Sequence, residues 1–184
     1  MNQPMMDFEQ KGVEPRILIA GIANIFLGDD AFGVEVTQRL ARRMLPDEVR
    51  IVDFGIRGFD LAYALLDSCD VAILVDAVPR GEKPGTLYVI EPDLAGLDNA
   101  DEQEMIVETH GMNPIKVLHL VKSMGGGGFK RILLIGCEPA ILESEEEGYM
   151  GLSEPVQAAV GEAIELIESL VADILNRDCN TATL

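Results

Sequence analysis

Five short apolar runs alternate along the chain with segments of helical periodicity, and this alternation restricts the possible folds more than any other feature. The runs are rich in Ile, Val and Leu, and each has the length of a strand. They cover Ile17–Ala20, Arg50–Phe54, Val71–Asp76, Leu87–Ile90 and Arg131–Gly136. Strands that alternate with helices form βαβ units, in which consecutive strands are parallel. The sequence therefore predicts an α/β fold with a mostly parallel, five-stranded sheet.

The hydrophobic pattern also predicts which strands are central. The first, third and fifth runs are almost continuously apolar, as expected for strands that helices cover on both faces. The turn sequence Pro84-Gly85-Thr86 precedes the fourth run, so that strand can run antiparallel to its neighbour.

Four segments have the apolar spacing of helices. The predicted helices are Ala31–Met44, Phe59–Leu66, Pro114–Ser123 and Ser153–Leu175. The last has the clearest pattern, with one continuous apolar stripe and glutamates on the opposite face. Ser153 suits the N-cap position of this helix, because its side chain can accept a hydrogen bond from the first turn.

The length of 184 residues fits one hydrophobic core. We expect a single domain over residues 16–176, with a flexible N-terminal tail at 1–15 and a flexible C-terminal tail at 177–184. The formal net charge of −18 argues against partners that are nucleic acids or anionic membrane surfaces. This acidity either maintains solubility or steers a basic partner toward the protein.

Three cysteines are widely spaced along the chain, and no pair has the spacing of a metal or redox motif. A reducing, cytoplasmic location fits this pattern. No apolar run approaches the length of a membrane span, and the first residues lack a signal-peptide core.

Side chains that can bind metals follow several of the predicted strands. Asp29 and Asp30 come soon after the first strand, where we do not expect an adjacent pair of acids to serve packing. Asp76 closes the third run, either as the N-cap of the next turn or as a ligand. His110 lies between the apolar residues 105–107 and a predicted helix.

The carboxyl ends of parallel strands share one edge of a sheet, where ligands commonly bind. Asp30, Asp76 and His110 can all reach that edge. Two carboxylates and one imidazole leave open positions around a divalent ion. The three residues therefore predict a catalytic or exchangeable metal site rather than a closed structural one.

Other chemistries have weaker support. A dinucleotide fingerprint is absent, because Ala23 and Phe26 stand where its second and third glycines are needed. A Gly-x-Ser-x-Gly elbow is also absent. Cys137 follows a predicted strand without an obvious basic neighbour, so we expect it to be buried and unreactive. His119 lies within a predicted helix, and we expect it to have a packing or surface role.

Three ordered segments resemble the hydrogenase maturation proteases. They are Gly21–Gly33, with its acidic pair, Val75–Val78, and His110–Asn113 at a helix start. The segments Gly136–Pro139 and Gly151–Ser153 are also similar, and the likeness extends from about residue 16 to 175. The resemblance implies a three-layer fold, in which a twisted sheet has helices on both faces. It also implies an endopeptidase that removes the C-terminal extension of a nickel-loaded nickel–iron hydrogenase large-subunit precursor.

The metal-binding positions of that family match Asp30, Asp76 and His110, and the resemblance implies that nickel arrives with the precursor. Ala23 departs from the family pattern by replacing its second glycine. The loop Asp53–Gly58 also departs from the usual family sequence.

The resemblance implies that this loop lines the substrate groove, through Asp53, Gly55, Arg57 and Gly58. Asp53 is expected to help orient the peptide, and Phe54 and Arg57 to influence which precursor is accepted.

The sequence is also compatible with two functions of other classes. A non-catalytic chaperone that checks the nickel site of the hydrogenase would need the same metal ligands. A small-molecule-binding α/β enzyme could share the fold. We expect the hydrogenase large-subunit precursor as partner, and a monomer or weak homo-oligomer.

Overall fold

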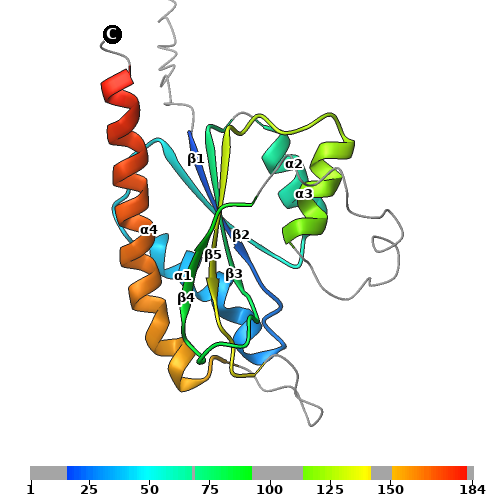
Figure 1. Cartoon of the computed structure of the whole chain (residues 1–184), viewed down its shortest axis with the longest axis vertical. Helices are drawn as coiled ribbons and strands as arrows, with labels where there is room; N and C mark the ends of the chain where they lie inside the picture. Colours follow the sequence, from blue (N-terminus) through cyan, green and yellow to red (C-terminus); the bar gives the residue numbers. More distant parts are fainter. Residues whose placement is uncertain (1–15, 68, 93–113, 142–150, 182–184) are drawn as a thin grey trace, which may run out of the picture.

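The sheet of the computed structural model has five strands in the order β2-β1-β3-β5-β4 (Figure 1). The structure describes residues 16–67, 69–92, 114–141 and 151–181. The strands are β1 (Ile17–Ile22), β2 (Val49–Gly55), β3 (Val71–Ala77), β4 (Leu87–Ile90) and β5 (Arg131–Cys137). All neighbouring strands are parallel except β4, which pairs antiparallel with β5. The predicted strands and the direction of the fourth are confirmed.

Helices cover both faces of the sheet, so the fold is the expected three-layer α/β arrangement (Figure 1). α1 (Phe32–Leu40) and α4 (Glu154–Thr181) lie on one face. α2 (Gly58–Leu66) and α3 (Pro114–Ser123) lie on the other.

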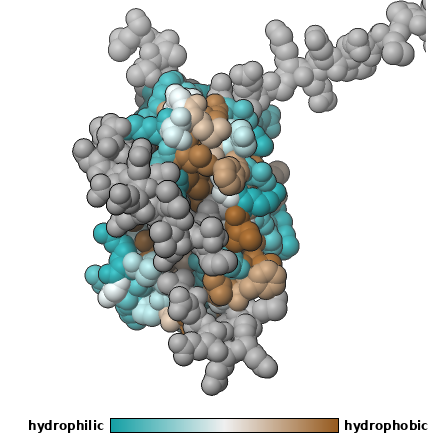
Figure 2. Space-filling view, turned by 90° about the vertical axis from the view of Figure 1, so that its right-hand side faces the viewer, coloured by the Kyte–Doolittle hydropathy of each residue, from teal (hydrophilic) through white to brown (hydrophobic). Residues whose placement is uncertain are grey.

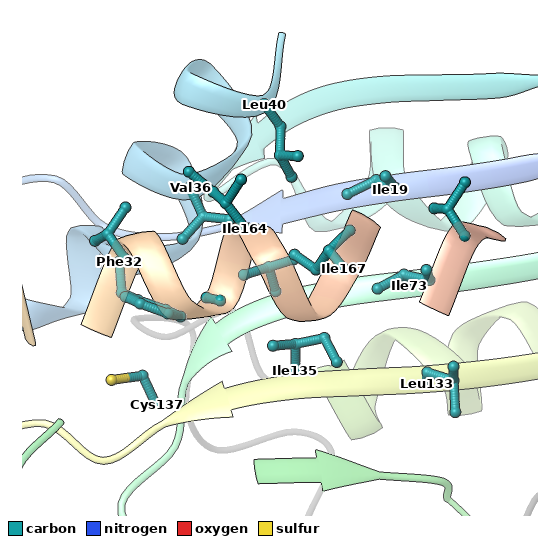
Figure 3. Close-up of a cluster of buried hydrophobic side chains, with 14 of the residues drawn as sticks. Ile19, Phe32, Val36, Leu40, Ile73, Leu133, Ile135, Cys137, Ile164 and Ile167 are labelled. Carbon is teal, nitrogen blue, oxygen red and sulfur yellow. The ribbon is translucent and has the colours of Figure 1, made fainter. Parts of the chain in front are cut away.

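Alternate residues of the central strands point into two separate hydrophobic clusters. Ile19, Ile73 and Ile135 pack against α1 and α4 (Figure 3). Their sequence neighbours Ala20 and Leu74 belong to the cluster beneath α2 and α3. Because both faces are buried, these strands have continuous apolar sequences rather than alternating ones.

Two helix boundaries differ from the sequence prediction. α1 ends at Leu40 rather than Met44, because the N–H groups of Arg42 and Arg43 bond to carbonyls three residues back. Such bonds tighten the chain and end the α-helix. At its start, the single-turn 3₁₀-helix η1 (Gly28–Ala31) precedes α1.

The C-terminal boundary is also corrected. α4 continues to Thr181, beyond the predicted end at Leu175 and into the residues 177–184 that we expected to form a flexible tail. The sequence from 162 to 181 contains no glycine or proline that would end the helix. The predicted N-terminal tail at 1–15 lies outside the described residues. In the described part of the chain, no helix combines the length and apolar character needed to span a bilayer.

The strand order creates a topological switch point between β1 and β3. From β1 the chain passes along α1 to β2 on one side, and from β2 it returns along α2 to β3 on the other side. In such sheets, ligands bind in the crevice outside the carboxyl ends of the two strands at the switch. This edge is the lower end of the sheet in Figure 1, where α1 and α4 begin.

Candidate active site

Two acidic side chains meet at the switch point. Asp76 is the second-last residue of β3, and its side chain is buried, with Oδ1 accepting a hydrogen bond from the Ala77 N–H at 2.9 Å. Asp30 lies in η1, just after β1, and is half-buried. Its Oδ2 accepts a hydrogen bond from the Asn24 N–H at 2.7 Å. The structure thus brings together two of the three predicted metal ligands.

The two carboxyl groups influence each other electrostatically. Burial raises the pKa of Asp76 well above its ordinary range, and the nearby negative charge of Asp30 raises it further. Burial also raises the pKa of Asp30, while the hydrogen bond from Asn24 lowers it. Within the described residues, no ion pair joins either carboxylate to a basic side chain. A site of this kind favours a proton or a cation between the two acids.

Close backbone packing brings these acids together. A Cβ at Gly33 would lie 2.2 Å from the carbonyl oxygens of both Ile22 and Val75. A Cβ at Gly21 would lie 2.5 Å from the Thr37 Oγ1 of α1. The start of α1 therefore packs directly on the backbones of β1 and β3, which only glycine permits. This packing holds η1, and with it Asp30, beside the end of β3.

Asp29 has a different role from its neighbour. Its side chain is completely buried, and Oδ2 accepts hydrogen bonds from the Ala140 and Ile141 N–H groups, both at 2.8 Å. Oδ1 accepts a bond from the Ser153 N–H at 2.6 Å, and the Ser153 hydroxyl donates to Oδ2 at 2.9 Å. The expectation that the acidic pair does not serve packing is therefore wrong for Asp29, which joins η1 to the segment after β5 and to the residue before α4.

Ser153 immediately precedes α4, as predicted, and its carbonyl accepts the Gln157 N–H at 2.8 Å. Its hydroxyl bonds to Asp29 across the molecule. The start of α4 and the 3₁₀ turn that carries Asp30 are thus held by the same carboxylate.

The third predicted ligand, His110, lies outside the described residues, and its place in the site stays a prediction. Among the residues that the structure does describe, no group of three His, Cys, Asp or Glu side chains is arranged to hold a metal ion. His119 lies on α3 and is half-buried, in agreement with the packing or surface role expected for it.

The predicted substrate loop leaves the same edge of the sheet from β2. Asp53 and Gly55 belong to the end of β2, and Gly58 begins α2. The Arg57 guanidinium donates hydrogen bonds to the carbonyls of Asp53 and Phe54, so it bends back over its own loop. Phe54 is buried in the core, and its expected influence on specificity stays a prediction. That these loop residues bind substrate stays a prediction.

Sequence reasoning gave no role to Glu138, which follows β5 at the same edge. Its buried carboxylate accepts hydrogen bonds from the N–H groups of Arg80 at 2.8 Å and Gly81 at 3.0 Å, and from the Tyr88 hydroxyl. Glu138 therefore holds the loop that follows Asp76. An acid directly after a buried strand was the available signal, and it is the same signal that Asp76 gave.

Burial and the nearby Glu138 carboxylate also raise the pKa of two further groups. Burial, the hydrogen bond to Glu138 and its charge raise the pKa of Tyr88 to about 12. Burial and the charges of Asp29 and Glu138 raise the pKa of the Cys137 thiol to about 12. Cys137 is buried, as predicted, and the raised pKa keeps its thiol protonated at neutral pH, where it is a poor nucleophile.

Comparison with known proteins adds to this geometry. The model of the hydrogenase maturation protease family matches residues 34–170, a range that contains Asp76 and His110 and begins after Asp30. The Hydrogenase 2 maturation protease of Escherichia coli is 31% identical over 159 residues, which are 83% of this chain and 88% of that protein. The hydrogenase expression/formation protein HupM of Azotobacter chroococcum is 32% identical over 163 residues, 88% of this chain and 74% of that protein.

Solved structures share the fold. The hydrogenase maturating endopeptidase HybD from E. coli has a TM-score of 0.65 and 29% identity, over 86% of this chain and 93% of that chain. The hydrogenase 2 maturation peptidase from a Thaumarchaeota archaeon has a TM-score of 0.63 and 33% identity, over 85% of this chain and 98% of that chain.

Proposed function

Because the chain belongs to the hydrogenase maturation protease family and is an endopeptidase, we propose that it removes the C-terminal extension of a nickel–iron hydrogenase large-subunit precursor that already contains nickel. The observation that supports this substrate is the pair of carboxylates at the switch point. Asp30 and Asp76 converge there from different elements, and the charge of one raises the pKa of the other.

We assign the contacts with the nickel of the precursor to Asp30, Asp76 and His110. Two carboxylates and one imidazole suit a divalent ion and leave positions for ligands that the precursor supplies. Bound nickel supplies Lewis acidity, which can polarise the scissile carbonyl or activate a water.

The chain's own groups prepare this site. The Asn24 N–H holds one oxygen of Asp30, and the Ala77 N–H holds one oxygen of Asp76. Each carboxylate can then present its other oxygen to the precursor. A cation that binds between the acids replaces the proton that the raised pKa of Asp76 favours. Asp53, Gly55, Arg57 and Gly58 lie on the neighbouring loop and are proposed to orient the peptide.

The test compares nickel-loaded and nickel-free precursor and follows the change in size of the large subunit. We expect cleavage of the loaded form only, and loss of cleavage in Asp76→Asn and His110→Ala. Glu162→Gln is the matched control, because it removes one negative charge at an exposed position of α4.

Two results would contradict the proposal. Cleavage of nickel-free precursor at the same rate as the loaded form would contradict the role of nickel. Tight binding of loaded precursor without cleavage would favour the checking chaperone. The cytoplasmic location and the monomer or weak homo-oligomer stay predictions.

A further inference from the structure

The helix α2 is apolar on two faces. Leu61 and Leu65 on its inner face are completely buried in the core. Phe59 and Tyr63 on its outer face are 70% and 60% exposed, and their spacing of four residues places them side by side. A helix that is apolar on opposite faces usually has packing partners on both.

A second exposed apolar segment lies in the loop after β1, next to the loop that leads into this helix. The side chains of residues 25–27, Ile-Phe-Leu, are exposed in the loop after β1. The Ala23 N–H donates to the Gly55 carbonyl at 3.1 Å, so this loop and the one leading into α2 start side by side. Ile56, which follows Gly55, is 64% exposed.

We call this set of exposed side chains the apolar rim. It consists of Ile25, Phe26, Leu27, Ile56, Phe59 and Tyr63. These are six of the ten large apolar side chains that are exposed in the described part of the chain. Figure 2 shows hydrophobic surface on the face of the molecule that carries α2 and α3. The exposed apolar surface is thus concentrated in two neighbouring segments rather than scattered.

The apolar rim is also nearly free of charge, in a protein whose formal net charge is −18. Residues 20–28 contain no charged side chain. Residues 54–66 contain only Arg57 and Asp60, which form an ion pair at 3.5 Å. The cores of protein–protein interfaces are depleted of charge and rich in aromatic side chains. The rim has both properties.

The rim is continuous with the proposed active site. The Asp30 N–H donates to the Leu27 carbonyl at 3.1 Å, so the last residue of the exposed loop connects directly to η1. On the other segment, Arg57 bonds to the carbonyl of Asp53 at the end of β2. A protein substrate that reaches the two carboxylates therefore meets the rim as well.

We propose that the apolar rim is the docking surface for the folded body of the large-subunit precursor, which presents an apolar and uncharged patch to it. This inference rests on the proposed function. A second copy of this chain fits less well, because two molecules with charges of −18 repel each other. Such a copy would also cover the approach to Asp30.

The test uses the double variant Phe59→Ser, Tyr63→Ser, in which both side chains are exposed and distant in sequence from the carboxylates. We expect KM for nickel-loaded precursor to rise roughly tenfold or more, with kcat changed by less than about twofold, because the lost contacts are the same in ground and transition states. Phe26→Ser is a second variant on the loop, and it should raise KM in the same way.

Met44→Ser is the matched control, because Met44 is fully exposed and lies beyond the far end of α1. Its KM should equal that of the parent protein, and melting temperatures should agree among all variants. Normal cleavage by the parent, together with an unchanged KM in the double variant, would overturn the docking surface and leave the proposed function standing.

Failure of the parent to cleave any loaded precursor would overturn the proposed function, and the docking surface with it. Analytical ultracentrifugation distinguishes one further outcome, in which the rim joins two copies of this chain. A parent dimer that the double variant dissociates, without a change in KM, would make the rim an interface between copies and overturn the proposal.

Discussion

The carboxylate of Asp29 accepts a hydrogen bond from the Ser153 N–H at 2.6 Å, although the two residues are 124 positions apart in the sequence. The same side chain accepts bonds from two N–H groups after β5 and from the Ser153 hydroxyl. Three regions of the chain that meet at the carboxyl edge of the sheet therefore share one buried acceptor.

Asp29→Ala is expected to destabilise the protein by roughly 3 kcal/mol, because buried donors lose a charged acceptor. Chemical denaturation measures this loss. The adjacent change Asp30→Ala should alter the unfolding free energy much less, since Asp30 is half-buried and accepts one backbone bond. Asp30→Ala should nevertheless abolish processing of the precursor. Equal destabilisation by the two variants would contradict the separate roles of the two acids.

Asp76→Asn is expected to stabilise the protein at neutral pH while it lowers processing by about 100-fold or more. Burial and the charge of Asp30 raise the pKa of Asp76 in the folded state above its unfolded value. The folded state therefore binds the proton more tightly, and the unfolding free energy falls as the pH rises from the unfolded pKa toward the folded one. Asparagine does not titrate in this range, so the stability of Asp76→Asn does not fall with pH for this reason.

The measurement is the melting temperature from pH 4 to pH 8, taken without added metal. The parent should lose stability relative to Asp76→Asn as the pH rises through this range. A variant that melts below the parent at every pH would show that the Asp76 carboxylate serves the fold rather than the substrate.

The sequence predicts most of the fold because burial produces apolar patterns that can be recognised in the sequence. β1, β3 and β5 are continuously apolar, and the stripe of α4 extends over several turns. These patterns depend only on neighbouring residues and on which side of an element they face. The end of α1 at Leu40 was not predictable in this way, because it depends on local hydrogen bonds rather than on the apolar pattern.

The candidate site was predictable only in part. Asp76 was found because an acid closes a buried strand. Nothing in the local sequence distinguishes Asp29 from Asp30, since the partners of Asp29 are 111 to 124 residues away. Glu138 directly follows a buried strand, which was a local signal for it, but its partners at Arg80 and Gly81 are far away in the sequence, so its role in holding that loop was not predictable.

Gly33→Ala is expected to destabilise the protein by about 3 kcal/mol, because its Cβ would lie 2.2 Å from two backbone carbonyl oxygens. Neither oxygen belongs to a flexible side chain, so α1 and η1 must shift. Gly161→Ala in α4 is the matched control, since nothing lies within 4 Å of its Cβ position. This control should raise the unfolding free energy by about 0.5–1 kcal/mol. Equal effects in denaturant titrations would contradict the close packing of α1.

Tyr88 is expected to ionise later than an ordinary tyrosine, with a pKa of about 12 against 10.0 in the unfolded chain. Because the folded state holds the phenol proton more tightly, the contribution of Tyr88 to stability is present below pH 10 and decreases as the pH rises toward 12. Absorbance titration of the phenolate measures the shift, with Tyr88→Phe identifying the signal. Glu138→Gln should remove part of the shift, since burial is its largest cause and the charge of Glu138 a smaller one. A titration of Tyr88 that is unchanged in Glu138→Gln would show that the charge of Glu138 does not contribute to this shift.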